Sequence, residues 1–279
     1  MVASMQSTAN HGGPSPAETS FDQVRDLFRS SRKAESEFHK WHGNPKRQAV
    51  VPVVEAHRTR ILYDLTVDHI EEVVHDTDHA LGEVKWLEVK PVKKLVNWNP
   101  DFAFTHLFAY MIEHRSEVPT WQTFREFIWY DELGRSIGDQ AREEIDAEIK
   151  RSGTSRQTAN DAAHWRIGNA YYGLLRETYV IIHLRALGLD IRCHPLADAL
   201  FHADAWHGRT IISIRVANEN YTSGEDGRKI RPDELLADAK PPFRFETLEL
   251  DKATYADRGK PRLPTRKQIA DLAERLRIF

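Results

Sequence analysis

Residues 158–187 read TANDAAHWRIGNAYYGLLRETYVIIHLRAL, a stretch that contains no proline and is followed by Gly188. This pattern predicts one long helix that ends at the glycine. Apolar residues at alternating three- and four-residue spacing form two stripes along it, which is typical of a helix buried between layers. The first stripe comprises Trp165, Gly168, Tyr172, Leu175, Tyr179, Ile182 and Ala186, and the second comprises Ala170, Gly173, Leu174, Val180, Ile181 and Leu184.

Glu177 lies in the middle of the second apolar stripe. An ionised carboxylate in such surroundings is costly unless a cation compensates its charge. One interpretation is a structural salt bridge to Arg176, Arg185 or another arginine. The other is that Glu177 helps to bind a metal ion, and the sequence leaves both open.

The residues after the helix alternate between apolar and polar side chains, as strands do. Residues 189–194 are expected to form a half-buried strand that ends at Pro195. Residues 200–218 are expected to form a β-hairpin with a turn at His207 and Gly208, which would place Trp206 opposite Arg209. Strand alternation then gathers four polar residues on one face of an otherwise apolar hairpin. These residues are His202, Asp204, Ser213 and Arg215.

A helix with one buried acid, a strand with an aspartate and an apolar strand with an alternating polar pair follow one another in this segment. The segment resembles the core of the PD-(D/E)xK nuclease superfamily, the restriction-endonuclease-like fold, over about residues 160–250. The resemblance implies that Glu177 is the helix acid, Asp204 the strand aspartate and Ser213-Ile214-Arg215 the acid-x-Lys motif.

In that family the acids hold Mg²⁺ or Mn²⁺, which activates water and neutralises charge on the phosphate, and the lysine orients or deprotonates the water. The resemblance therefore implies a metal-dependent endonuclease acting on DNA, with restriction or defence as one expected role. It implies that Glu177 and Asp204 are the metal ligands. The implied catalytic residues are Glu177, Asp204, Ser213 and Arg215.

Two residues depart from the family pattern. Ser213 supplies a hydroxyl where a carboxylate would bind metal, and the guanidinium of Arg215 cannot act as a base. Another acid or lysine could replace them, and the candidates are Asp198, Glu219, Lys229 and Lys240. The alternative function is a catalytically inactive nuclease-fold module that binds nucleic acid or a partner protein. In that case Arg215 is the expected counter-charge for Glu177 and Asp204.

Basic residues that could contact DNA lie near the end of the chain. Arg228 and Lys229 follow Gly227 in a segment that precedes an expected short helix after Pro232. Residues 242–250 are expected to form a further strand. A final helix begins at a Thr265-x-x-Gln268 capping box and carries a basic outer face. The candidate nucleic-acid-binding residues are Arg228, Lys229, Arg266 and Lys267.

The chain before the long helix has a helical pattern from residue 20 to about residue 150, which predicts a helical domain. Residues 1–19 are small and polar and are expected to be a disordered tail. The polar segment at residues 150–161 is interpreted as the boundary, and the second domain would span residues 158–279. The predicted fold class is α+β, a helical N-terminal half followed by a small restriction-endonuclease-like α/β domain with a mixed sheet.

The composition excludes several classes of protein. Lys and Arg number 39 and Asp and Glu 42, and the net charge of -3 excludes a polybasic protein that coats nucleic acid. Cys193 is the only cysteine, so an intrachain disulfide and a cysteine-rich zinc module are excluded. No apolar run reaches the roughly 18–20 residues of a membrane span. The expectation is a soluble, cytoplasmic protein with no membrane partner.

Two further patterns have the spacing of functional sites and are interpreted as coincidental. His75 and His79 have the spacing of zinc ligands on a helix, but no third ligand accompanies them. Glu88 and Lys90 form an acid-x-Lys pair that lies in the helical half. A third hypothesis, beside the nuclease and the inactive module, is a helical scaffold whose sheet is only structural.

Overall fold

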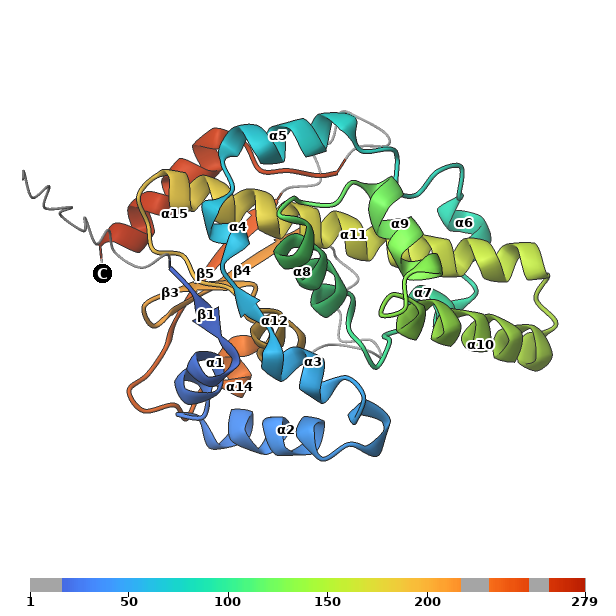
Figure 1. Cartoon of the computed structure of the whole chain (residues 1–279), viewed down its shortest axis with the longest axis horizontal. Helices are drawn as coiled ribbons and strands as arrows, with labels where there is room; N and C mark the ends of the chain where they lie inside the picture. The colour runs from blue at the N-terminus through green and yellow to red at the C-terminus, as the bar shows by residue number, and fades with distance from the viewer. Residues whose placement is uncertain (1–16, 217–230, 251–260, 279) are drawn as a thin grey trace, which may run out of the picture.

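Helix α11 (Arg156–Ala186) runs through the centre of the computed structural model, which describes residues 17–216, 231–250 and 261–278 (Figure 1). The predicted long helix is therefore confirmed, although it begins two residues before Thr158. Ser155 caps it by accepting a hydrogen bond from the Thr158 N–H at 3.1 Å. Most side chains on both apolar stripes are buried, as the sequence predicts for a helix between layers.

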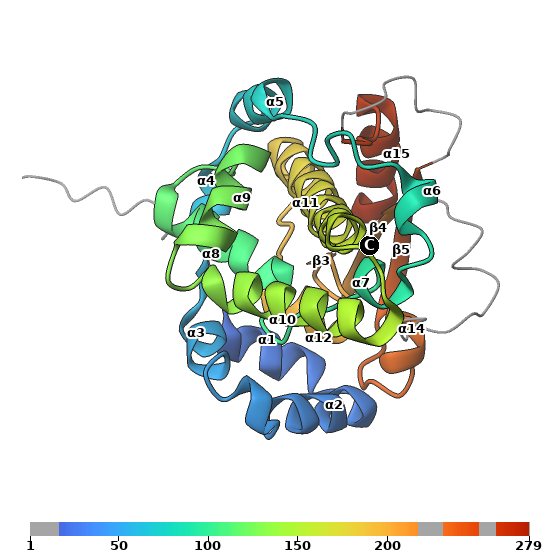
Figure 2. The same cartoon turned by 90° about the vertical axis from the view of Figure 1, so that its right-hand side faces the viewer.

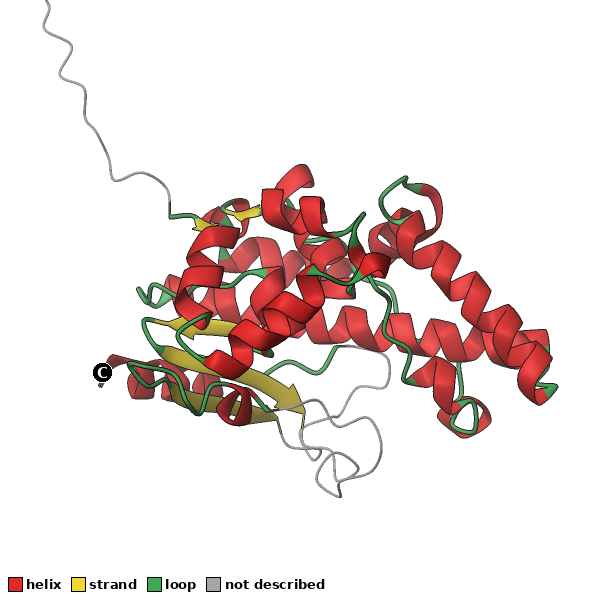
Figure 3. Cartoon of the chain, turned by 90° about the horizontal axis from the view of Figure 1, so that it is seen from below, coloured by secondary structure: helices red, strands yellow, loops and turns green. Residues whose placement is uncertain are grey.

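The chain that precedes α11 is almost wholly helical, as expected (Figure 3). Gly153 ends the last of its helices in a left-handed conformation, with a φ of 70°. The helices are α1 (Phe21–Phe28), α2 (Arg32–His42), α3 (Val51–Ala56), α4 (Ile61–Asp64), α5 (Val67–Asp76), α6 (Trp86–Val89), α7 (Lys93–Val96), α8 (Phe104–Arg115), α9 (Trp121–Tyr130) and α10 (Arg135–Ser152).

A mixed three-stranded sheet follows α11, so the α+β class is confirmed. Strand β3 (Ala205–His207) pairs antiparallel with β4 (Thr210–Val216), and β4 pairs parallel with β5 (Arg244–Leu250). The helix α14 (Pro232–Leu235) lies between β4 and β5 in the chain. The sheet is packed against α11 through β4 and against α15 (Arg266–Arg277) through β5.

The predicted hairpin exists, but its register is shifted. Trp206 pairs with Ile211 rather than with Arg209, so Gly208 and Arg209 form the turn. Gly208 has a φ of 55°, which explains the glycine at that position. The shift is two residues, so the side chains of the paired residues keep the faces that the alternation assigns to them, whereas His202 and Asp204 lie before β3.

Residues 189–194 and residues 200–202, the start of the expected hairpin, do not form the expected strands. Residues 189–194 form only a single antiparallel bridge, between Arg192 and Trp206. Residues 195–201 form helix α12 (Pro195–Phe201), with Pro195 in the first turn and the His194 ring accepting the Leu196 N–H at 3.1 Å. His202 is the left-handed residue that ends α12, so it lies outside the hairpin. A proline after a capping residue starts a helix as readily as it ends a strand, and here the helix forms.

The expected helical and α/β domains share one hydrophobic core. Phe28 of α1 stacks on Phe201 of α12 at a centroid distance of 4.6 Å and on Phe243, next to β5, at 5.7 Å. Its ring also contacts Trp206 of β3 edge-on. The boundary at residues 150–161 is thus a turn between α10 and α11 within one packed body (Figure 2).

Both ends of the described chain are tied to this body. The expectation of a disordered tail is wrong at Thr19, because Thr19 and Ser20 form β1, which pairs with β2 (Arg58–Thr59). Residues 1–16 lie outside the described residues. At the other end, the predicted capping box of α15 is confirmed, since Thr265 and Gln268 exchange backbone-to-side-chain hydrogen bonds. Among the described helices, none combines the length and apolar character needed to cross a membrane.

Candidate metal centre

Three carboxylates from three separate elements meet beside the middle of α11. They belong to Glu177 of α11, Asp198 of α12 and Asp204, which precedes β3. One oxygen of each lies within 4.8 Å of the others, and all three residues are partly buried. The structure thus brings together the two predicted metal ligands and adds Asp198, which the sequence offered without a distinctive spacing.

The backbone of β4 orients Asp204. The chain bends at this residue, and β3 begins only at Ala205. The Ile214 N–H of β4 donates to Oδ2 of Asp204 at 2.6 Å, so the carboxylate satisfies a backbone group beyond the end of β3. This hydrogen bond fixes Asp204 relative to the sheet.

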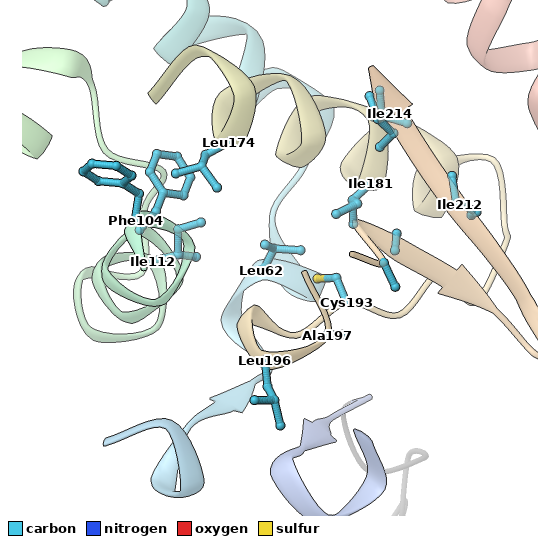
Figure 4. Close-up of a cluster of buried hydrophobic side chains, with 14 of the residues drawn as sticks. Leu62, Phe104, Ile112, Leu174, Ile181, Cys193, Leu196, Ala197, Ile212 and Ile214 are labelled. Carbon is cyan, nitrogen blue, oxygen red and sulfur yellow. The ribbon is translucent and has the colours of Figure 1, made fainter. Parts of the chain in front are cut away.

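The three acids border a small cavity of about 50 Å³ between the N-terminal helices and α11. Much of its wall is apolar, and Figure 4 shows Leu62, Ile112, Leu174 and Ile181 entering this interior from α4, α8 and α11. Such a volume holds a cation and a few water molecules. No lysine or arginine lines it within the described part of the chain.

The donor set fits a hard divalent cation. Carboxylate oxygens are the ligands that Mg²⁺, Mn²⁺ and Ca²⁺ prefer, and three like charges so close together repel one another without a cation. Two oxygens bound to one Mg²⁺ are at most about 4.2 Å apart, and two bound to one Ca²⁺ at most about 5.2 Å. The three carboxylate oxygens are separated by at most 4.8 Å, which lies between these two limits.

Ser213 and Arg215 are not part of the centre. Both lie on β4, on the face opposite Ile214, and neither lines the cavity. The Nε of Arg215 pairs with Glu249 of β5 at 3.0 Å, on an exposed surface. The expectation that Arg215 compensates Glu177 and Asp204 is therefore wrong, because the parallel strand β5 supplies a carboxylate directly beside it.

The expected salt bridge from Arg185 to Glu177 is also absent. The Arg185 guanidinium donates to the Ile191 carbonyl at 2.7 Å, pairs with Asp190 and lies over the Tyr63 ring. Arg176 donates to the carbonyls of Arg262 and Tyr172.

The candidate DNA-binding residues lie away from the metal centre or outside the residues that the structure describes. Arg228 and Lys229 fall in residues 217–230, which the structure does not describe, as does Glu219. Arg266 pairs with Glu71 of α5 at 2.8 Å, so its charge already has a partner within the protein. Lys267 and Lys240 are exposed.

A fourth acid, Glu113 of α8, lines the same cavity and has no distinguishing signal in the sequence. Its carboxylate accepts the N–H groups of Ile61 and Leu62 at 2.8 and 3.2 Å, so it joins α8 to the start of α4. Burial raises the pKa of the Glu113 carboxyl. Both carboxylate oxygens accept hydrogen bonds from the backbone at the start of α4. We therefore infer that Glu113 holds this part of the cavity wall in position.

The interpretation of His75 and His79 as a coincidental pair agrees with their surroundings. Helix α5 ends at Asp76, so the two residues do not share a helical face. His75 contacts Asp76, whereas His79 contacts the Tyr172 hydroxyl at 2.8 Å.

Cys193 lines the cavity and is expected to be unreactive in the folded protein. Burial raises the pKa of its thiol to about 12. Compared with the ordinary value of 9.0, this lowers the thiolate fraction about a thousandfold at pH 8. Alkylation by iodoacetamide, followed by mass spectrometry, should be slow in buffer and fast in denaturant. Rapid labelling of the folded protein would show that the cavity opens.

Searches of protein-family models, of curated proteins and of solved structures found no match to this chain.

Proposed function

We propose that this protein is a divalent-metal-dependent phosphodiesterase acting on DNA, with Glu177, Asp198 and Asp204 as the cation ligands. The observation that carries the proposal is the convergence of these three carboxylates from α11, α12 and the start of the hairpin. A divalent cation held there would lower the pKa of a water molecule and stabilise negative charge on a phosphoryl group.

The arrangement around the ligands supports the nuclease-like interpretation of the sequence. A long helix supplies one acid, an antiparallel hairpin supplies the second, and a parallel strand follows the hairpin. Asp198 takes the role that Ser213 cannot fill. The Ile214 N–H holds Asp204 in place, so binding a cation requires little reorganisation of that side chain.

A second candidate function is a metal-binding module that holds DNA without cleaving it. The observation that favours it is the cavity lining, which contains no lysine or arginine among the described residues. A basic side chain that orients or deprotonates the attacking water is thus missing from the described wall, and catalysis would depend on a carboxylate for that role.

Titration with Mn²⁺, followed by electron paramagnetic resonance, tests the metal centre directly. We expect one bound ion per chain, and a loss of at least about tenfold in affinity for Asp198→Asn and for Asp204→Asn, since each change removes a charged ligand. Asp271→Asn is the matched control, because Asp271 is exposed on α15. Equal Mn²⁺ binding by all four proteins would contradict the assignment.

Cleavage of supercoiled and linear DNA in Mg²⁺, Mn²⁺ or Ca²⁺ separates the two candidate functions. The phosphodiesterase is expected to cut in Mg²⁺ or Mn²⁺ and to lose activity with Asp204→Asn but not with Asp271→Asn. Specific Mn²⁺ binding with no cleavage of either substrate would favour the second candidate.

A further inference from the structure

The short helices α6 and α7 carry a group of lysines that the metal centre does not use. Lys85, Lys90, Lys93 and Lys94 are all exposed on these helices and the turn between them. Lys85 pairs with Glu88 at 3.2 Å. The other three have no acidic partner in the part of the chain that the structure describes.

A pair of stacked tryptophans lies beside these lysines. The ring of Trp86 on α6 stacks on that of Trp165 on α11, with a centroid distance of 4.9 Å and an interplanar angle of 30°. Trp86 is 38% exposed, which is unusual for a side chain of its size. The aromatic surface is therefore open to a ligand.

A separate hydrophobic cluster holds this surface in place. Both helices pack against α11, on the side of the molecule that Figure 2 turns to the viewer. Val89, Val92 and Leu95, which lie among the lysines in the sequence, are buried and pack with apolar residues of α10 and α11. The cluster contains Val89, Val92, Leu95, Ile145, Ala159, Ala162 and Ala163. Lysines and tryptophan are thus presented by a packed element rather than by a loose loop.

We propose that α6 and α7 form a binding surface for single-stranded nucleic acid. The three lysines contact phosphates, and an unpaired base stacks on Trp86. Lysine next to an exposed aromatic ring is the combination with which proteins hold single strands without reading their sequence. A paired base cannot offer its face to Trp86, and the four residues of α6 are too few to form a reading helix in a groove.

This surface is distinct from the metal centre. Trp165 and Glu177 are twelve residues apart on α11, which corresponds to about 18 Å along the helix axis. Binding there requires no cation, so the proposal does not rest on metal binding or cleavage.

The test is fluorescence anisotropy of a labelled oligo(dT) strand, titrated with the full chain in EDTA over a series of KCl concentrations. Replacing Lys90, Lys93 and Lys94 together by Gln should weaken binding. The slope of log K against log salt should become smaller by about 2, since each phosphate contact contributes about 0.7 on a single strand. The matched control replaces Lys33, Lys40 and Lys46, which are exposed on and after α2, and should bind like the original protein.

A second variant, Trp86→Leu, tests the stacking. Loss of one stacked base should weaken binding at least about fivefold, and the quenching of tryptophan fluorescence by the strand should decrease. Thermal unfolding of each variant establishes that the fold persists, and the lysine variant changes only exposed groups.

Three results would overturn the proposal. They are absence of oligo(dT) binding, equal weakening by the lysine variant and its control, and tighter binding of duplex than of single strand. If polyglutamate competes as well as oligo(dT) does and Trp86→Leu has no effect, the surface recognises acidic protein instead. Because EDTA is present and the carboxylates are unchanged, none of these results bears on the metal centre.

Discussion

Acidification from pH 6.5 to pH 4 should lower the free energy of unfolding steeply, because buried histidines stay neutral in the folded protein. His57, His106 and His194 come from separate segments and meet beside the cavity wall, with the rings of His57 and His194 5.0 Å apart. Burial, followed by nearby cationic groups, lowers the pKa of His57 to about 4 and that of His106 to about 3. Burial also lowers the pKa of His194.

Stability falls with acidification because the unfolded chain takes up more protons than the folded protein does. The unfolded chain binds protons at these residues below about pH 6.5, whereas the folded protein does not until about pH 4 or lower. Each pH unit in this window then removes about 1.4 kcal/mol of stability per histidine, or about 3 kcal/mol for His106. The stabilisation is complete above pH 6.5 and is lost as the pH falls towards 4.

Urea unfolding of His106→Leu across this pH range isolates the contribution of one ring. His106 is 3% exposed and its Nδ1 has no hydrogen-bond partner in the described structure, so leucine replaces it without stranding a donor or acceptor. The variant should lose about 3 kcal/mol less than the original protein between pH 6.5 and pH 4. His39→Leu, at an exposed position, is the control. Parallel curves for His106→Leu and the original protein would contradict the assignment.

Gly168→Ala is expected to destabilise the protein by about 1–3 kcal/mol, because the added methyl group meets backbone. A Cβ at this position would lie 2.5 Å from the Ala80 carbonyl oxygen and 2.9 Å from Leu81 Cδ2. His164 and Tyr172, one turn before and after Gly168, hydrogen-bond to the same Ala80 backbone at 2.8 Å. These hydrogen bonds hold the segment that follows α5 against α11. The segment cannot move away from the added methyl group without breaking them.

Gly173→Ala, five residues further along the same helix, is the matched control. A Cβ there would contact only Oε1 of Glu177, at an ordinary distance of 3.9 Å. Since alanine is favoured over glycine within a helix by up to about 1 kcal/mol, this variant should be slightly more stable. Chemical denaturation of both variants gives the comparison. Equal effects of the two substitutions would contradict the idea that Gly168 is needed for the close contact between α11 and the Ala80 backbone.

The features of the fold that were predicted correctly depend on local or periodic signals. The two stripes of α11, its end before Gly188 and the capping box at Thr265 are each encoded within a few turns of helix. Alternation placed β5 and the two faces of the hairpin in the same way. The start of the expected hairpin was wrong, because residues 200 and 201 belong to α12 and His202 ends that helix. The proline after His194 is compatible with either the end of a strand or the start of a helix.

By itself the sequence determined most of the elements, their apolar faces and the two acids, Glu177 and Asp204, that stand out against apolar surroundings. Only the tertiary structure decided that Asp198 joins them and that Arg215 pairs with Glu249. It alone gathered three buried histidines, and it placed Trp86 on Trp165 beside exposed lysines. The physical reason is that spacing along the chain fixes which side of its own element a residue occupies. Which residues meet across elements depends on how those elements pack, and no local pattern records that.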